Sequence, residues 1–225
     1  MTPFGKCFDI GNATASSISA WRKGYPISEC GAREDLDNGN GALMRIAPIA
    51  LLNINNQNST SRLSKTILYS SLTHAHPRSL IACIIYTEFL LQLYMCQDKM
   101  KAMSAIKKFC HDHSQNILHK AEWSHYNRIL DDNIWELNSD EIKSGGYVVH
   151  TLEAAMWCLF KHHNFKDTVL EAVNLGEDTD TTGIVAGSMA GMLYGFDAIP
   201  ADWVNTLKKI EMIKGLCGKF AECLL

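Results

Sequence analysis

The chain has 225 residues, 47% of them hydrophobic, which is enough apolar material for one packed core. Its formal net charge of −3 at pH 7 gives no electrostatic reason to expect binding to nucleic acid or to an anionic membrane. The most apolar stretch, residues 80–95, contains Thr87, Glu88 and Gln92, so it falls short of the roughly 18 apolar residues of a membrane-spanning helix.

Helical periodicity dominates the chain from end to end. Apolar residues recur at spacings of three and four, and the alternation typical of strands is absent. Pro48 and Pro77 stand where helices would begin, and Pro200 marks a break. The pattern predicts helices over residues 13–22, 44–53, 60–72, 78–96, 99–118, 149–163, 166–175, 181–195 and 202–223. We therefore expect an all-α fold, a compact single-domain helical bundle.

Two short segments are rich in glycine. The first, residues 31–45, contains Asn38-Gly39-Asn40-Gly41 before a predicted helix. Such a loop permits strained backbone and leaves N–H groups accessible, which suits a phosphate or ribose cradle; a plain tight turn is equally compatible. The second segment, residues 144–149, is a glycine turn that leads an aromatic residue into a helix.

The most informative stretch is residues 176–183, where three carboxylates and three hydroxyls precede a very apolar helix. Asp178 and Asp180 place hard oxygens where Mg²⁺, Mn²⁺ or Ca²⁺ could bind. The alternative is a capped core helix whose acids only accept hydrogen bonds from free N–H groups. Glycine then recurs at positions 183, 187, 191 and 195, which forms a narrow stripe that admits another helix or a ligand.

Two known motifs have the same residue pattern as this stretch, and the surrounding sequence excludes both of them. A calcium EF-hand loop needs a bidentate glutamate at its twelfth position, which here is Met189. A haloacid-dehalogenase-type phosphotransferase needs its first aspartate at the end of a buried strand. Residues 167–174 instead have the pattern of a helix, and too few residues follow for the rest of that domain.

Five blocks follow one another in a fixed order along the chain. They are residues 8–12 (FDIGN), 37–48 (DNGNGALMRIAP), 72–78 (LTHAHPR), 144–148 (SGGYV) and 173–182 (VNLGEDTDTT). In these blocks the sequence resembles the ADP-ribosylglycohydrolase family, and most closely its dinitrogenase-reductase-activating branch. The resemblance implies an all-α bundle with two divalent cations, Mg²⁺ or Mn²⁺, at the bottom of an ADP-ribose cleft. It also implies hydrolysis of the N- or O-glycosidic bond between ADP-ribose and a protein side chain or small acceptor.

The resemblance also implies roles for individual residues. Asp178, Asp180 and Thr181 match metal ligands, and Asp37 and Asp178 match acids that act in catalysis. The residues that match substrate contacts are Asn38, Gly39, Asn40, Gly41, His74, Gly146 and Tyr147. Two cations can orient ribose hydroxyls and polarise a water molecule while carboxylates move protons.

One departure from the family affects the metal site. Family members begin with a Gly-Asp-x-x-Gly helix and a Thr-Asp-Asp-Thr segment that supplies further metal ligands, and residues 1–225 start downstream of both. We therefore expect a domain that is incomplete at its amino terminus and holds half of the metal ligands. We also expect an exposed core and an exposed glycine stripe, which would favour self-association.

The sequence leaves two other functions open. One is an inert module that binds ADP-ribose through Asn40, His74 and Tyr147, and the other is a helical remnant that needs a partner chain. For the hydrolase and for the binding module, the expected partner is ADP-ribose or an ADP-ribosylated protein. We expect no nucleic acid and no membrane as partners. Because no signal-peptide segment is visible, we expect a cytoplasmic location.

Overall fold

The computed structural model describes residues 9–114 and 120–224, and every regular element within these ranges is helical. The helices are α1 (Asn12–Arg22), α2 (Ile27–Cys30), α3 (Ala47–Leu52), α4 (Ser59–Ser71), α5 (Pro77–Cys96), α6 (Lys99–Ser114), α7 (Lys120–Trp123), α8 (Asn127–Leu130), α9 (Val148–Lys161), α10 (Phe165–Asn174), α11 (Thr179–Tyr194), α12 (Ala201–Thr206) and α13 (Ile210–Glu222). Short 3-10 turns join them, at Asp35–Asp37, Leu43–Arg45, Ser124–Tyr126, Ile134–Glu136, Ser139–Glu141 and Phe196–Ala198. The all-α prediction is confirmed.

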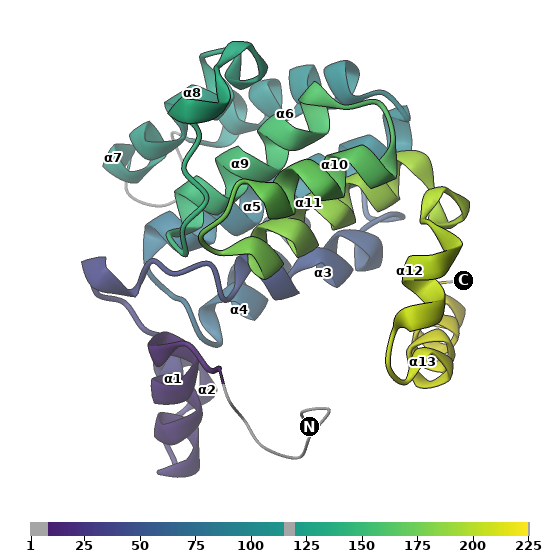
Figure 1. The fold of residues 1–225 in the computed structure, drawn as a ribbon. Helices are drawn as coiled ribbons and strands as arrows, with labels where there is room; N and C mark the ends of the chain where they lie inside the picture. The colour runs from purple at the N-terminus through teal and green to yellow at the C-terminus, as the bar shows by residue number, and fades with distance from the viewer. Residues whose placement is uncertain (1–8, 115–119, 225) are drawn as a thin grey trace.

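Helix α5 forms the centre of the bundle and contacts α3, α4, α6, α9 and α11 (Figure 1). It is apolar on all sides, and a helix of that kind is stable in water only when it is surrounded. By length and composition α5 could cross a membrane, but 78% of its apolar window is buried by the rest of the protein. Its burial identifies it as the core helix.

The glycine stripe of α11 faces α10 of the same chain. A Cβ atom at Gly183 would lie 3.0 Å from Val173 Cγ1, and one at Gly187 would lie 3.5 Å from Val169 Cγ2. The missing side chains therefore let the two helix backbones approach closely. The expectation that the stripe would be exposed is wrong at Gly183 and Gly187, which lie partly buried against α10, whereas Gly195 at the end of α11 is exposed.

Two predicted helices end differently from the expectation. The predicted helix 202–223 is two helices, because α12 ends at Thr206 and Lys209 takes the left-handed conformation (φ 61°) before α13. The predicted helix 99–118 is helical to Ser114, and its last residues lie outside the described part. Helix α13 and the pair α1–α2 stand out from the bundle on opposite sides of Figure 1.

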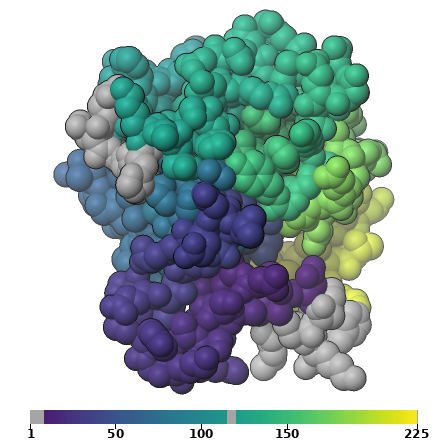
Figure 2. All heavy atoms as spheres, turned by 90° about the vertical axis from the view of Figure 1, so that its left-hand side faces the viewer, coloured from purple at the N-terminus to yellow at the C-terminus, as the bar shows by residue number. Residues whose placement is uncertain are grey.

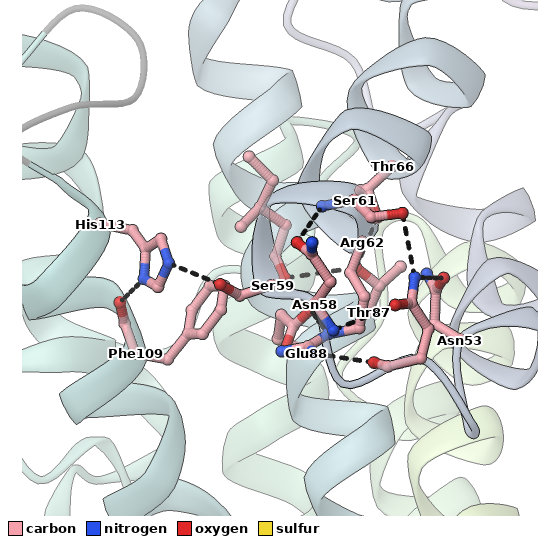
Figure 3. Close-up of polar contacts among 12 residues, drawn as sticks. Asn53, Asn58, Ser59, Ser61, Arg62, Thr66, Thr87, Glu88, Phe109 and His113 are labelled. Carbon is pink, nitrogen blue, oxygen red and sulfur yellow. Dashed lines mark hydrogen bonds and ion pairs between the residues drawn. The ribbon is translucent and has the colours of Figure 1, made fainter.

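A buried ion pair fastens α4 to α5. The Arg62 guanidinium donates to the Glu88 carboxylate through Nε at 2.7 Å and Nη2 at 2.9 Å, and through Nη1 to the Asn56 carbonyl at 3.0 Å. The two charged side chains are only 10% and 5% exposed. Figure 3 shows this pair between the Asn58 cap of α4 and the ring of Phe109 from α6. The bidentate geometry satisfies both charges inside the bundle.

Removal of one partner should be costly because the other charge then stays buried alone. We predict that Arg62→Met lowers the free energy of unfolding by about 3–5 kcal/mol in urea denaturation. Arg62→Met combined with Glu88→Leu should recover part of the loss. The control is Glu211→Gln at the exposed Lys214 pair, which should change stability by less than about 0.5 kcal/mol. An Arg62→Met variant as stable as this control would contradict the assignment.

Candidate active site

Backbone hydrogen bonds bring four distant segments to one place. Residue pairs Ala32–His74 and Gly39–Tyr147 form isolated bridges, so the glycine loop is fastened to two other segments. The Asn40 amide donates to the Gly146 carbonyl at 3.0 Å. The Asp178 amide donates to the Ser144 carbonyl at 3.1 Å, which joins the same turn to the start of α11.

These segments enclose a cleft of about 640 Å³, a size typical of small-ligand sites. Helix α1 forms one wall, and Figure 2 shows it in purple against the indigo segment around residues 31–45. Of the predicted site residues, nine line the cleft: Asp37, Gly39, Asn40, Gly41, His74, Gly146, Asp178, Asp180 and Thr181. The sequence blocks therefore converge in space.

Asp178 lies at the centre of the polar contacts in the cleft. Its Oδ2 accepts from Asn40 Nδ2 at 2.8 Å, and its Oδ1 accepts from the Thr181 amide as the N-cap of α11. Burial raises the pKa of Asp178, but the hydrogen bonds from Asn40 and Thr181 outweigh it and hold the pKa below its ordinary value. The carboxylate is therefore ionised at neutral pH and keeps lone pairs for a further partner.

Asp180 and Thr181 lie on the first turn of α11 beside Asp178. Asp180 is exposed and lines the same cleft as Asp178. The Thr181 hydroxyl is buried and lies 3.8 Å from the Met44 sulfur, which is a weak acceptor. Two neighbouring carboxylates and a hydroxyl suit a hard divalent cation such as Mg²⁺ or Mn²⁺. They supply only part of the about six oxygens that such an ion takes.

A second cluster of potential metal ligands lies elsewhere. Within residues 9–114 and 120–224, the one group of three His, Cys, Asp or Glu ligand atoms within 4.8 Å of one another is Asp35, His76 and Glu122. Arg78 already contacts this group, with Nε 2.8 Å from Glu122 Oε2 and Nη2 3.7 Å from Asp35 Oδ1. The guanidinium supplies the positive charge that a cation would bring, so the start of α11 remains the better metal site.

His74 lies against the glycine loop. A Cβ atom at Gly41 would lie 2.9 Å from His74 Cε1, so only glycine leaves room for the ring. Burial, and then the charge of Arg45, lower the pKa of His74 to about 4, against a smaller opposite effect of Asp37. The imidazole is therefore neutral at pH 7.

Asn38 and Tyr147 are the two predicted site residues that do not line the cleft. The Asn38 side chain is buried, donates to the Asp35 carbonyl at 3.0 Å and accepts from the Ser79 hydroxyl at 2.9 Å. The Tyr147 ring contacts His150 edge to face, and Arg78 lies 6.0 Å from its centroid. The Asn38 side chain therefore holds the glycine loop against α5, and the Tyr147 ring lies against the first turn of α9. Their predicted contact with substrate stays a prediction.

Comparison with known proteins places nearly the whole chain in one family. A sequence model described as ADP-ribosylglycohydrolase matches residues 1–224. The chain belongs to the ADP-ribosylglycohydrolase family. This confirms the resemblance found in the five sequence blocks.

Relatives within this family cover nearly all of the chain. ADP-ribosylarginine hydrolase Tri1 of Pseudomonas putida (strain GB-1) and its namesake from Serratia proteamaculans (strain 568) are 31% and 34% identical over 97% and 94% of this chain. The chain spans 55% and 54% of the lengths of these two proteins. The ADP-ribosyl-dinitrogen-reductase glycohydrolase of Rhodospirillum rubrum is 30% identical over 90% of this chain and 62% of its own.

A solved structure shares the fold. A chain of an "ADP-ribosylglycohydrolase-related protein complex" superimposes with a TM-score of 0.75 at 28% identity, over 96% of this chain and 70% of that one. The bundle described here is therefore the ADP-ribosylglycohydrolase fold.

Sequence reasoning missed several members of this ADP-ribosylglycohydrolase cleft. Thr14 from α1 and Met44 line it, and so does Leu36, whose side chain is 99% exposed at the rim. Leu36 stands between two aspartates in a turn, and no periodic pattern marks such a residue. Met44 belongs to the MRIAP block, but its contact with Thr181 depends on the tertiary fold.

The capping role of Asp178 can be separated from its charge. We predict that Asp178→Ala lowers the free energy of unfolding by about 1 kcal/mol, because the Thr181 amide loses its partner. Asp178→Asn should cost less, since asparagine is also a good N-cap and only the hydrogen bond from Asn40 Nδ2 is lost.

The measurement is urea denaturation at pH 7. Because the folded-state pKa of Asp178 is depressed, the ionic part of its stabilisation is present above the unfolded-state pKa of about 3.9 and is lost as the pH falls through the folded-state value. Equal losses for the two variants would argue against the cap.

Proposed function

We propose that this chain carries the active-site cleft of an ADP-ribosyl hydrolase. The reaction is cleavage of the N- or O-glycosidic bond between ADP-ribose and a protein side chain or small acceptor. The observation that supports it best is the convergence of Gly39–Gly41, His74, Gly146 and the start of α11 in one cleft. Two relatives are named ADP-ribosylarginine hydrolases, so arginine is the acceptor to test first.

The glycine loop provides a site for the pyrophosphate. The amides of Gly39 and Gly41 make no hydrogen bond within the described part of the chain, and both residues line the cleft. Free backbone N–H groups at a glycine turn bind anionic oxygens. His74 closes the same side of the cleft, beside Gly41.

Carboxylates occupy the reacting end of the proposed site. Asp37 lines the cleft and is oriented by the Glu34 amide, which donates to its Oδ2 at 3.0 Å. We assign Asp37 to proton transfer, and Asp178, Asp180 and Thr181 to holding Mg²⁺ or Mn²⁺. A bound divalent cation would polarise a water molecule and orient the ribose hydroxyls.

A second function competes with hydrolysis. The described residues offer two carboxylates and one hydroxyl at the start of α11, fewer oxygens than Mg²⁺ prefers. This favours an ADP-ribose-binding module with weak metal affinity and slow turnover. Binding and turnover therefore need separate measurements.

Metal binding should depend on the start of α11. We predict that Asp178→Asn combined with Asp180→Asn abolishes the heat of Mn²⁺ binding in calorimetry, because both charged ligands are lost. The asparagine at position 178 keeps the helix cap, so the variant should fold. The control is Asp35→Asn, which removes one member of the rival cluster with His76 and Glu122. Loss of binding in Asp35→Asn alone would move the metal to that cluster.

ADP-ribose should bind in the cleft and hydrolysis should be slow. We predict that millimolar ADP-ribose raises the Tm of the 225-residue chain, and that Gly41→Ala weakens this response because the new methyl group displaces His74. Gly215→Ala on α13 is the matched control, since its Cβ would meet nothing within 4 Å and it does not line the cleft. Release of ADP-ribose from ADP-ribosyl-arginine with Mn²⁺ should be slow and should disappear in Asp178→Asn. Turnover that is indifferent to Asp178 would contradict the proposed site.

A further inference from the structure

Three side chains form a hydrogen-bonded chain that ends at the cleft. Arg45 Nη2 lies 2.8 Å from Thr73 Oγ1, and Thr73 Oγ1 lies 2.9 Å from His74 Nδ1. His74 is 3% exposed and lines the cleft. Its other nitrogen, Nε2, makes no hydrogen bond within residues 9–114 and 120–224.

The donors available fix the direction of the first of these hydrogen bonds and favour one direction for the second. The Arg45 guanidinium can only donate, so Thr73 Oγ1 accepts from it. The threonine oxygen could accept a second hydrogen bond, but the hydroxyl proton also needs an acceptor, and among the hydrogen bonds of the described residues His74 Nδ1 is the acceptor available to it. If Thr73 donates to Nδ1, the neutral ring must carry its single proton on Nε2.

The residues around His74 keep its ring neutral and direct the Nε2–H group toward the glycine loop. Burial and then the positive charge of Arg45 oppose a second proton on His74, and the charge of Asp37 favours one. A Cβ atom at Gly41 would lie 3.2 Å from Nε2 and one at Gly39 would lie 3.8 Å from it. The Nε2 edge therefore points at the glycine loop.

We propose that Arg45 and Thr73 are positioning residues that fix His74 as an Nε2–H donor to an anionic oxygen in the cleft. The oxygen belongs to the pyrophosphate of ADP-ribose, and this last step rests on the proposed function. The tautomer of the free protein does not depend on it. Arg45 touches no ligand and acts only through Thr73.

The tautomer can be read directly by long-range ¹H–¹⁵N NMR of the full chain at pH 7. His74 should show a protonated Nε2 and an unprotonated Nδ1, with its signals assigned by their loss in His74→Gln. His113 provides an internal reference of the opposite kind. Its Nδ1 lies 2.8 Å from the Phe109 carbonyl, which can only accept, and its Nε2 faces the Ser59 hydroxyl at 3.2 Å.

Variants of Thr73 and Arg45 test this hydrogen-bond relay, the chain from Arg45 through Thr73 to His74. Thr73→Val removes the hydroxyl and should shift His74 to a mixture of tautomers, while Thr73→Ser should restore the wild-type pattern. In calorimetry with ADP-ribose, Thr73→Val should raise Kd by about three- to tenfold, the range of one neutral hydrogen bond, and Thr73→Ser should not. Arg45→Met should resemble Thr73→Val.

The outcomes separate this inference from the proposed function. A proton on His74 Nδ1 in the wild type, or an Nε2–H pattern unchanged in Thr73→Val, would overturn the relay whatever the protein binds. If the predicted tautomer pattern is found but ADP-ribose produces no response, the relay is supported and the assignment of ADP-ribose as the ligand is wrong.

Discussion

The hydrogen bond between Asn40 Nδ2 and the Asp178 carboxylate joins segments 138 residues apart, and the cleft depends on it. Asn40 Nδ2 also lies 2.9 Å from Thr151 Oγ1 on α9, so one amide group connects the glycine loop, α9 and α11. The same carboxylate caps α11 and is the charge that we expect a cation to use. A carboxylate has about four acceptor positions, so these roles are compatible. The Asp178 side chain therefore fixes both the geometry of the cleft and the start of α11.

Much of the bundle could be predicted because its helices satisfy simple rules. The apolar α5, the proline at its start and the acidic N-cap of α11 are visible in the spelling of the sequence. The break between α12 and α13 is not, because Lys209 carries the left-handed conformation without a glycine. The glycine stripe was recognised, but its partner α10 was identified only in the structure.

The site residues that could be predicted are those whose type and spacing in the sequence indicate a chemical role. The acids of the EDTDTT segment and the NGNG loop stand out in any reading, and the structure brings them together in one cleft. Arg45 and Thr73 do not stand out, because their importance lies in a hydrogen-bond chain to His74. Asn38 shows the opposite case: it belongs to the loop motif, yet its buried side chain contacts the protein rather than the cleft.

The central claim is that metal and ADP-ribose share the cleft at the start of α11. Paramagnetic broadening by substoichiometric Mn²⁺ in a ¹H–¹⁵N spectrum of the chain with ADP-ribose tests it most directly. We expect the amide signals of Gly146 and Thr181 to broaden most, while those of α6, on the other side of the bundle in Figure 1, stay sharp. Broadening strongest at His76 and Glu122 would contradict the account.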